Sequence, residues 1–219
     1  MYDLARHVIF THPPKCAGTT IEVAFGWHPG HNRDTLQSLK NSYFGDCGMH
    51  EEELFQKFKH ARLDQHIEHL NIFNLDYSKF FKFTCIRNPW DIAVSRYFFN
   101  QKNNAIVKNK DFRHMSFSEY LQFRCVKQDT TSSKFLNLKF FTHYKDKYEM
   151  DFVVRYENYR EDFEELIKLF GVKYPTQKYN SNTRKDSERD YRKFYKNDKD
   201  IQLVAEAASD SIARFGYTF

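Results

Sequence analysis

The feature that most constrains this chain is the segment His7–Ala24, HVIFTHPPKCAGTTIEVA, which has the pattern of a strand, a turn and a helix. The run His7–His12 is short, apolar and rich in β-branched residues, as is typical of a buried strand. Two prolines follow, and proline ends a central strand because it has no amide hydrogen to donate. Lys15–Gly18 then predicts a tight turn, and Thr19–Thr20 open a helix, with threonine as a favourable N-cap.

This turn is a candidate phosphate site. A turn of small residues that leads into a helix presents backbone N–H groups and the positive end of the helix dipole. Lys15 adds a full charge, and two threonine hydroxyls add further donors. A nucleoside-triphosphate loop places its lysine after the last glycine and a Ser or Thr next to it for Mg²⁺. Here Lys15 precedes Gly18 and is followed by Cys16, which argues against that class. An ordinary strand-to-helix turn is the alternative.

Two further apolar runs, Phe80–Ile86 and Met150–Tyr156, predict buried strands. A helical pattern follows each of them, at Ile92–Phe99 and at Tyr159–Phe170. Other helices are expected at Ser116–Phe123 and Asp198–Phe215. Strands that alternate with helices predict an α/β fold, here a P-loop-like three-layer sandwich with a central, mainly parallel sheet flanked by helices. The length of 219 residues predicts a single domain, 1–219.

A second candidate phosphate site follows the strand Phe80–Ile86. Arg87 stands at its carboxyl end, and Ser95 comes about two turns into the next helix. Ligands of open parallel sheets bind outside the carboxyl ends of the strands. An arginine and a hydroxyl suit a terminal phosphate, because the guanidinium group makes charge-assisted hydrogen bonds. The alternative is a structural arginine that caps the end of the strand.

Composition excludes several classes of protein. Hydrophobic residues make up 41% of the chain and aromatic residues 18%, which is enough for a sizeable core. No apolar run approaches the length of a membrane span, and the first residues lack the pattern of a signal peptide. The four cysteines are far apart and form no C-x-x-C motif, which indicates free thiols in a reducing cytoplasm rather than a disulfide or a metal site. The net charge of +5 suits an anionic ligand.

Three motifs stand in order along the chain: PPKCAGTT at residues 13–20, KHAR at 59–62 and FKFTCIRNPWDIAVSRY at 81–97. Together they resemble the sulfotransferase family that uses 3′-phosphoadenosine 5′-phosphosulfate (PAPS). The similarity is to the branch of carbohydrate (heparan- and chondroitin-type) enzymes and their soluble microbial relatives. The segment VVRYENYREDFEELIKLFGV and the closing IARFGYTF also look like the family, so the resemblance covers nearly the whole chain.

The resemblance implies a role for each motif. The first would hold the 5′-phosphosulfate of PAPS through Lys15, Cys16, Ala17, Gly18, Thr19 and Thr20, with Lys15 also meeting the leaving oxygen. Arg87 and Ser95 would hold the 3′-phosphate. His60 would be the general base, with His12 and Glu22 next in line, and Asn182, Thr183 and Arg184 would close over the adenosine. Cys16 departs from the family pattern, where Ser or Thr is common, and Arg62 stands where a smaller residue is frequent.

The function that this resemblance implies is transfer of a sulfuryl group from PAPS to an acceptor hydroxyl, with a carbohydrate as the expected acceptor and no metal. The alternative is a P-loop-type nucleotide or small-molecule kinase. A third hypothesis is a nucleic-acid-binding module that uses the Lys/Arg-rich residues 184–196. We expect a small-molecule or carbohydrate partner, no nucleic acid and no membrane span. The oligomeric state and the identity of the acceptor stay open at this point.

Overall fold

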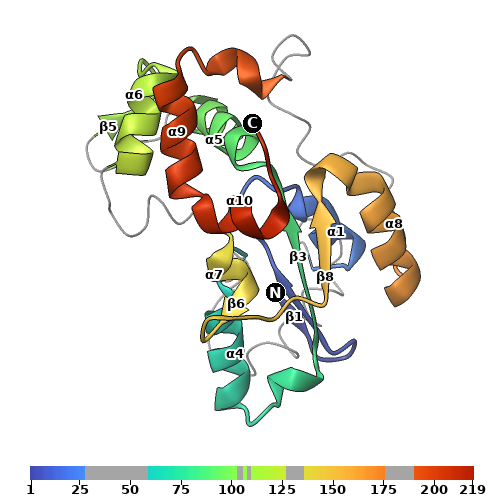
Figure 1. The fold of residues 1–219 in the computed structure, drawn as a ribbon. Coiled ribbons are helices and arrows are strands. Elements are labelled where there is room, and N and C mark those ends of the chain that lie inside the picture. The colour runs from blue at the N-terminus through green and yellow to red at the C-terminus, as the bar shows by residue number, and fades with distance from the viewer. Residues whose placement is uncertain (28–58, 103–105, 108–109, 127–135, 176–189) are drawn as a thin grey trace. The chain divides into compact units, whose positions relative to one another are not determined.

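The computed structural model describes residues 1–27, 59–102, 106–107, 110–126, 136–175 and 190–219 (Figure 1). The chain divides into two compact units, each built from two separate stretches. The first unit comprises Met1–Ile86 and Phe140–Asn180, and the second comprises Arg87–Lys139 and Ser181–Phe219.

A four-stranded sheet in the order β1-β2-β3-β8 forms the centre of the first unit. β2 (Val8–Thr11), β3 (Phe81–Ile86) and β8 (Phe152–Arg155) are parallel, and the edge strand β1 (Tyr2–Asp3) pairs with β2 in the antiparallel direction. The mainly parallel sheet of an α/β fold is therefore confirmed, as are the three predicted strands. The residues of β2 are all buried, which explains why its sequence is apolar up to Thr11.

Helices cover this sheet within the first unit. α1 (Gly18–Ala24) follows β2, and α8 (Tyr159–Phe170) follows β8 (Figure 1). Phe10 and Phe83, which are paired in register across β2 and β3, stack with ring centroids 4.8 Å apart. Phe25, just after α1, and Phe170, at the end of α8, lie against Phe83 and against each other. Through this aromatic cluster, α1 and α8 pack against one face of the sheet.

Other elements of the first unit complete its packing. They are α4 (Leu63–Ile72), the short helix η1 (Tyr77–Lys79) and the hairpin of β6 (His143–Tyr144) and β7 (Lys147–Tyr148). The helix α7 (Lys139–Thr142) begins at the boundary between the units. The hydroxyl of Thr11 donates a hydrogen bond of 2.7 Å to the carbonyl of Phe141. Thr11 follows Phe10 in β2, so its side chain belongs to the opposite face of the sheet from the aromatic cluster.

The second unit is built around α5 (Pro89–Lys102), which begins at the proline expected in its first turn. Its other elements are α6 (Phe117–Leu121), the π-helical turn η2 (Gln122–Val126), η6 (Tyr191–Phe194), α9 (Asp198–Ala207), α10 (Ser209–Phe215) and the short pair β4 (Ile106–Val107) and β5 (Lys110–Asp111). The expected capping box of Ser116 and Glu119 is present at α6.

The prediction of one continuous helix over Asp198–Phe215 is wrong, because the chain forms α9 and α10 with a break at Ala208. Ala208 is fully buried and has a φ of −115°, outside the helical range. Just beyond it, the hydroxyl of Ser211 accepts a hydrogen bond from the amide of Leu138 and donates one to the carbonyl of Leu136. These contacts fix the direction of α10, and no helix-breaking residue marks the change in the sequence.

In the part of the chain that the structure describes, no helix combines the length and the apolar character needed to cross a bilayer.

Candidate active site

The turn between β2 and α1 has an unusual backbone. Lys15 and Ala17 have φ angles of 70° and 65°, in the left-handed region that non-glycine residues rarely adopt. Each such residue costs on the order of 1–3 kcal/mol and persists only where the surrounding structure holds it, often at a ligand site. Alternating backbone conformations of this kind turn successive N–H groups toward a common point, which favours anions. The backbone of this turn is therefore compatible with the anion site that the sequence predicts.

The prediction that a threonine caps the helix after this turn is wrong. α1 begins at Gly18, its N-cap is Ala17, and no side chain caps it. The left-handed Ala17 starts the helix before the threonines, so Thr19 and Thr20 belong to the first turn of α1. Thr19 is buried, whereas Thr20 is partly exposed.

Gly18 makes room for the ring of His12. A Cβ atom at Gly18 would lie 2.3 Å from Cδ2 of His12 and 2.5 Å from its Nε2, distances that real Cβ atoms essentially never show. His12 is only 3% exposed and also stacks on Phe10, with ring centroids 5.7 Å apart. The end of β2 and the start of α1 can thus pack in direct contact because Gly18 has no side chain to clash with the His12 ring.

We expect Gly18→Ala to lower the free energy of unfolding by about 1–3 kcal/mol, the usual cost of overpacking, and to weaken nucleotide binding. Chemical denaturation and calorimetry with adenosine 3′,5′-bisphosphate would measure the two effects. The control is Gly171→Ala, where φ is 62° and nothing lies within 4 Å of the new Cβ. Gly171→Ala should cost about 1–2 kcal/mol through its backbone alone and leave nucleotide affinity unchanged. Wild-type stability and affinity in Gly18→Ala would show that the His12 ring moves aside freely.

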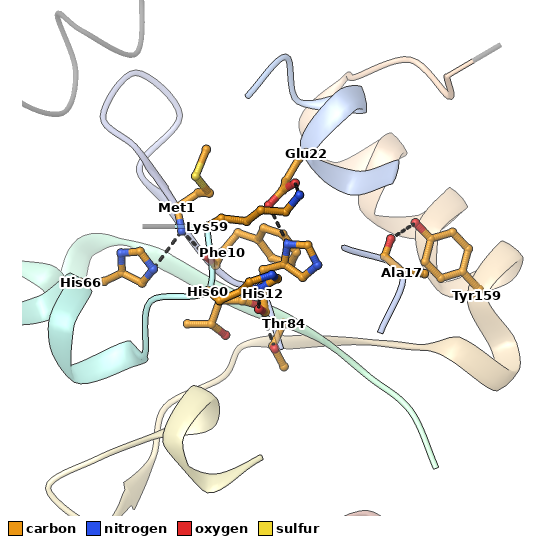
Figure 2. Close-up of polar contacts among 11 residues, drawn as sticks. Met1, Phe10, His12, Ala17, Glu22, Lys59, His60, His66, Thr84 and Tyr159 are labelled. Atoms are coloured by element: carbon orange, nitrogen blue, oxygen red, sulfur yellow. Dashed lines mark hydrogen bonds and ion pairs between the residues drawn. The ribbon is translucent and has the colours of Figure 1, made fainter. Parts of the chain in front are cut away.

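Glu22 is a fully buried carboxylate on α1. Nδ1 of His12 donates a hydrogen bond of 2.6 Å to its Oε1, and Nζ of Lys59 lies 3.7 Å from its Oε2 (Figure 2). Burial alone would raise the pKa of Glu22, but the charge and hydrogen bond of His12, followed by the charge of Lys59, lower it overall. Glu22 is therefore ionised at neutral pH and connects the end of β2 with the segment that carries His60.

His60 lies next to His12. Its Nδ1 donates a hydrogen bond of 2.8 Å to the carbonyl of His12, and the two rings meet edge to face with centroids 4.6 Å apart. This bond places the proton of neutral His60 on Nδ1 and leaves the lone pair on Nε2. Desolvation of the ring, followed by the proximity of His12, lowers the pKa of His60 well below its ordinary value. His60 is thus a neutral histidine with one basic nitrogen available, on a residue that is exposed to solvent although its Nδ1 is bonded to the protein.

Tyr159, the first residue of α8, contacts the loop Lys15–Thr20, and this contact was not predicted from the sequence. Its hydroxyl donates a hydrogen bond of 3.4 Å to the carbonyl of Ala17 (Figure 2). The same hydroxyl also interacts with the side chain of Thr20. Burial raises the pKa of Tyr159, so this phenol stays protonated and able to donate. The available signal was its position directly after the predicted strand Met150–Tyr156, at the same edge of the sheet as the loop.

Arg87 and Ser95 are both buried in the second unit, at 3% and 6% exposure. Nε of Arg87 donates a hydrogen bond of 2.7 Å to Oδ2 of Asp91, and its Nη2 lies 2.6 Å from the same oxygen. A carboxylate four residues along α5 therefore fixes the direction of the guanidinium group. The expectation that Arg87 and Ser95 converge on one phosphate stays a prediction.

Neighbours of Arg87 in the same motif have structural roles. Oδ1 of Asn88 accepts a hydrogen bond from the amide of Trp90 at the start of α5, and its Nδ2 donates to the carbonyl of Thr218. The indole of Trp90 donates to the carbonyl of Ile201 on α9. These contacts hold the amino end of α5, and with it the backbone that carries Arg87, against the C-terminal helices of the second unit.

The predicted adenosine segment Asn182–Arg184 lies outside the described residues. The loop Lys15–Thr20 and His60 belong to the first unit, and His60 is joined to the loop through His12 and Gly18. Within the described ranges, no group of three or more His, Cys, Asp or Glu side chains could hold a metal ion.

Comparison with known proteins agrees with this arrangement of motifs. The sequence model described as "Sulfotransferase family" matches residues 2–216, nearly the whole chain. No curated protein and no solved structure matches the chain significantly.

Proposed function

This chain belongs to the sulfotransferase family and is a PAPS-dependent transferase, and we propose that it sulfates a hydroxyl group of a carbohydrate with His60 as general base. The observation that carries the proposal is the loop Lys15–Thr20 with its two left-handed residues, joined to His60 through His12. The carbohydrate acceptor rests on the resemblance of the three motifs to the carbohydrate branch. The net charge of +5 suits a polyanionic acceptor as well as the donor.

The donor set of the loop fits the phosphosulfate end of PAPS. Lys15 supplies a cationic group, and the backbone amides of Cys16 and Ala17 supply neutral donors just before α1. The hydroxyls of Thr19 and Thr20 add two more. Such a mixture of one charge and several fixed donors suits a group with one negative charge on sulfate and one on phosphate. PAPS supplies an activated sulfuryl group whose leaving group is the 5′-phosphate.

For the 3′-phosphate of PAPS we propose Arg87 and Ser95. The ion pair with Asp91 supports this role, because it orients the guanidinium group before a ligand arrives. Asn182, Thr183 and Arg184 are proposed to close over the adenosine, as the family resemblance implies. We further propose that both units act together as one sulfotransferase domain, since a single family match spans them. The cytoplasmic location expected from the sequence stays a prediction.

The proposed reaction is an in-line displacement at sulfur. The acceptor oxygen forms a bond to sulfur, and the bond from sulfur to the bridging oxygen of the 5′-phosphate breaks. Negative charge develops on that bridging oxygen, where Lys15 would stabilise it, an effect commonly worth about 10²–10³ in rate. The proton of the acceptor hydroxyl moves to Nε2 of His60, which the hydrogen bond at Nδ1 leaves unprotonated.

Titration calorimetry in the presence of EDTA tests the proposal. We expect the chain to bind adenosine 3′,5′-bisphosphate without metal, and Lys15→Ala to weaken this binding at least tenfold, because a charge-assisted contact is worth about 1.5–3 kcal/mol. Sulfuryl transfer from labelled PAPS to a panel of carbohydrate hydroxyls would then identify the acceptor. Binding of Mg-ATP in preference to the bisphosphate would instead support a kinase. Transfer to phenols but to no sugar would remove the carbohydrate acceptor.

A further inference from the structure

Behind His60 lies a buried chain of polar contacts that ends at Glu22. We propose that Glu22 and His12 are positioning residues for His60: Glu22 fixes His12, and His12 holds His60 in the orientation and tautomer that accept a proton. Neither residue touches the reacting atoms in this proposal. The inference rests on the proposed role of His60 as the general base.

The first link is geometric. The His12 side chain has little freedom, because Glu22 bonds its Nδ1 at 2.6 Å, Phe10 stacks on its ring and Gly18 lies against its opposite nitrogen. The backbone of the same residue accepts the Nδ1–H of His60 at 2.8 Å. The His12 ring also meets the His60 ring edge to face with centroids 4.6 Å apart, so a shift of the His12 ring would remove a surface against which His60 packs.

The second link is electrostatic. Among the described residues, the titratable groups that act on His60 are His12 at the end of β2, Glu22 on α1 and the neighbouring Lys59. Of these charges, that of His12 has the largest effect and disfavours protonated His60, the negative charge of Glu22 favours it, and the positive charge of Lys59 disfavours it. A neutral histidine that acts as general base becomes a cation as the acceptor oxygen attacks sulfur. A carboxylate that is fully buried, with its charge little screened by water, is well suited to stabilise that cation.

This arrangement also explains why Glu22 is ionic although it is buried. An unpaired buried carboxylate would cost several kcal/mol, and a buried ion pair often adds little to stability. Here the carboxylate has a hydrogen bond from His12 and the charge of Lys59, while its Oε2 accepts no hydrogen bond in the described structure. A leucine at this position of α1 would fill a similar volume without the desolvation cost of a buried charge. A role in orienting and polarising His60 accounts for the carboxylate.

The test uses two variants with opposite expected signs. Glu22→Gln keeps an acceptor for Nδ1 of His12 but removes the negative charge, so the pKa of His60 should fall. Lys59→Met removes the opposing positive charge, so the pKa of His60 should rise. Histidine-labelled protein titrated by NMR would report both shifts without any turnover. Glu68→Gln, the same change at an exposed position on α4, should leave the pKa of His60 unchanged.

Turnover supplies the second readout. We expect Glu22→Gln to lower kcat about ten- to hundredfold, as loss of a supporting residue around a reactive group commonly does, with little change in donor affinity. Glu22→Asp should be slower than the wild type, because the shorter side chain keeps the negative charge but cannot place it at hydrogen-bond distance from Nδ1 of His12. Thermal melts would show whether each variant is folded at the temperature of the assay.

The two proposals can fail separately. The positioning role is wrong if the pKa of His60 moves in the same direction in Glu22→Gln and Lys59→Met, or if it moves in neither variant. This conclusion does not depend on which residue is the catalytic base. If the pKa moves as expected but His60→Ala retains full turnover, the positioning pair exists and the proposed base is wrong.

Discussion

Replacing His60 with alanine should lower turnover at least a hundredfold and leave the affinity for adenosine 3′,5′-bisphosphate unchanged. A positioned general base contributes about 10²–10⁴ in rate, so a hundredfold loss corresponds to about 2.7 kcal/mol in activation free energy. Donor affinity should survive because the proposed contacts to the nucleotide come from the loop Lys15–Thr20 and from Arg87. Steady-state kinetics with saturating PAPS and calorimetry with the bisphosphate would measure the two quantities.

His114→Ala is a matched control for this experiment, because His114 is an exposed histidine of the second unit. It should leave kcat within experimental error. If His60→Ala retained normal turnover, the base would have to be sought elsewhere. His12 and Glu22 are the next candidates, although both are buried and already bonded to each other.

The pH dependence of the wild-type enzyme provides a related check. Desolvation and the proximity of His12 lower the pKa of His60, so its neutral form persists as the pH falls through the ordinary histidine range near 6.5. The acid limb of kcat/KM should therefore lie clearly below pH 6.5. The negative charges of bound donor favour protonated His60, so the acid limb of kcat should lie at higher pH than that of kcat/KM.

Much of the fold follows from local pattern. The strands β2, β3 and β8 are mainly apolar runs that prolines or polar residues end, and α8 is an amphipathic helix that ends at a left-handed Gly171. Each of these signals depends only on neighbouring residues. The break at Ala208 could not be found in this way, because it arises from hydrogen bonds between Ser211 and the segment of Leu136 and Leu138.

In the candidate site too, some features depend on neighbouring residues and could be predicted, whereas others depend on contacts between distant segments. The turn after β2 could be located because a lysine, a glycine and two threonines follow a strand, but the left-handed backbone of Lys15 and Ala17 in that turn could not be predicted. The burial of Glu22 could not be predicted, since a glutamate on a short helix is usually solvated. Its contacts with His12 and Lys59 come from β2 and from a segment far along the chain. Likewise, the position of Tyr159 against Ala17 depends on how α8 packs.

Arg87→Met should have the largest effect on both stability and nucleotide selectivity. Its partner Asp91 is 8% exposed, and removing one member of a buried ion pair typically costs about 3–5 kcal/mol. The 3′-phosphate should also lose a charge-assisted contact, so affinity for adenosine 3′,5′-bisphosphate should fall at least tenfold. Affinity for AMP, which lacks that phosphate, should stay the same. Denaturation in urea and calorimetry with the two nucleotides would measure these changes.

The double variant Arg87→Met/Asp91→Leu separates the structural role of Arg87 from its proposed role in binding. Replacing a whole buried ion pair with apolar residues is often neutral or stabilising, so most of the lost stability should return. The selectivity for the bisphosphate should not return, because no guanidinium group is left to bind the 3′-phosphate. If the double variant instead bound the bisphosphate as the wild type does, Arg87 would be the structural cap of β3 that the sequence allowed as the alternative. An equal loss of affinity for both nucleotides in Arg87→Met would lead to the same conclusion. A general distortion of the site would weaken both nucleotides alike, whereas loss of a contact to the 3′-phosphate would weaken only the bisphosphate.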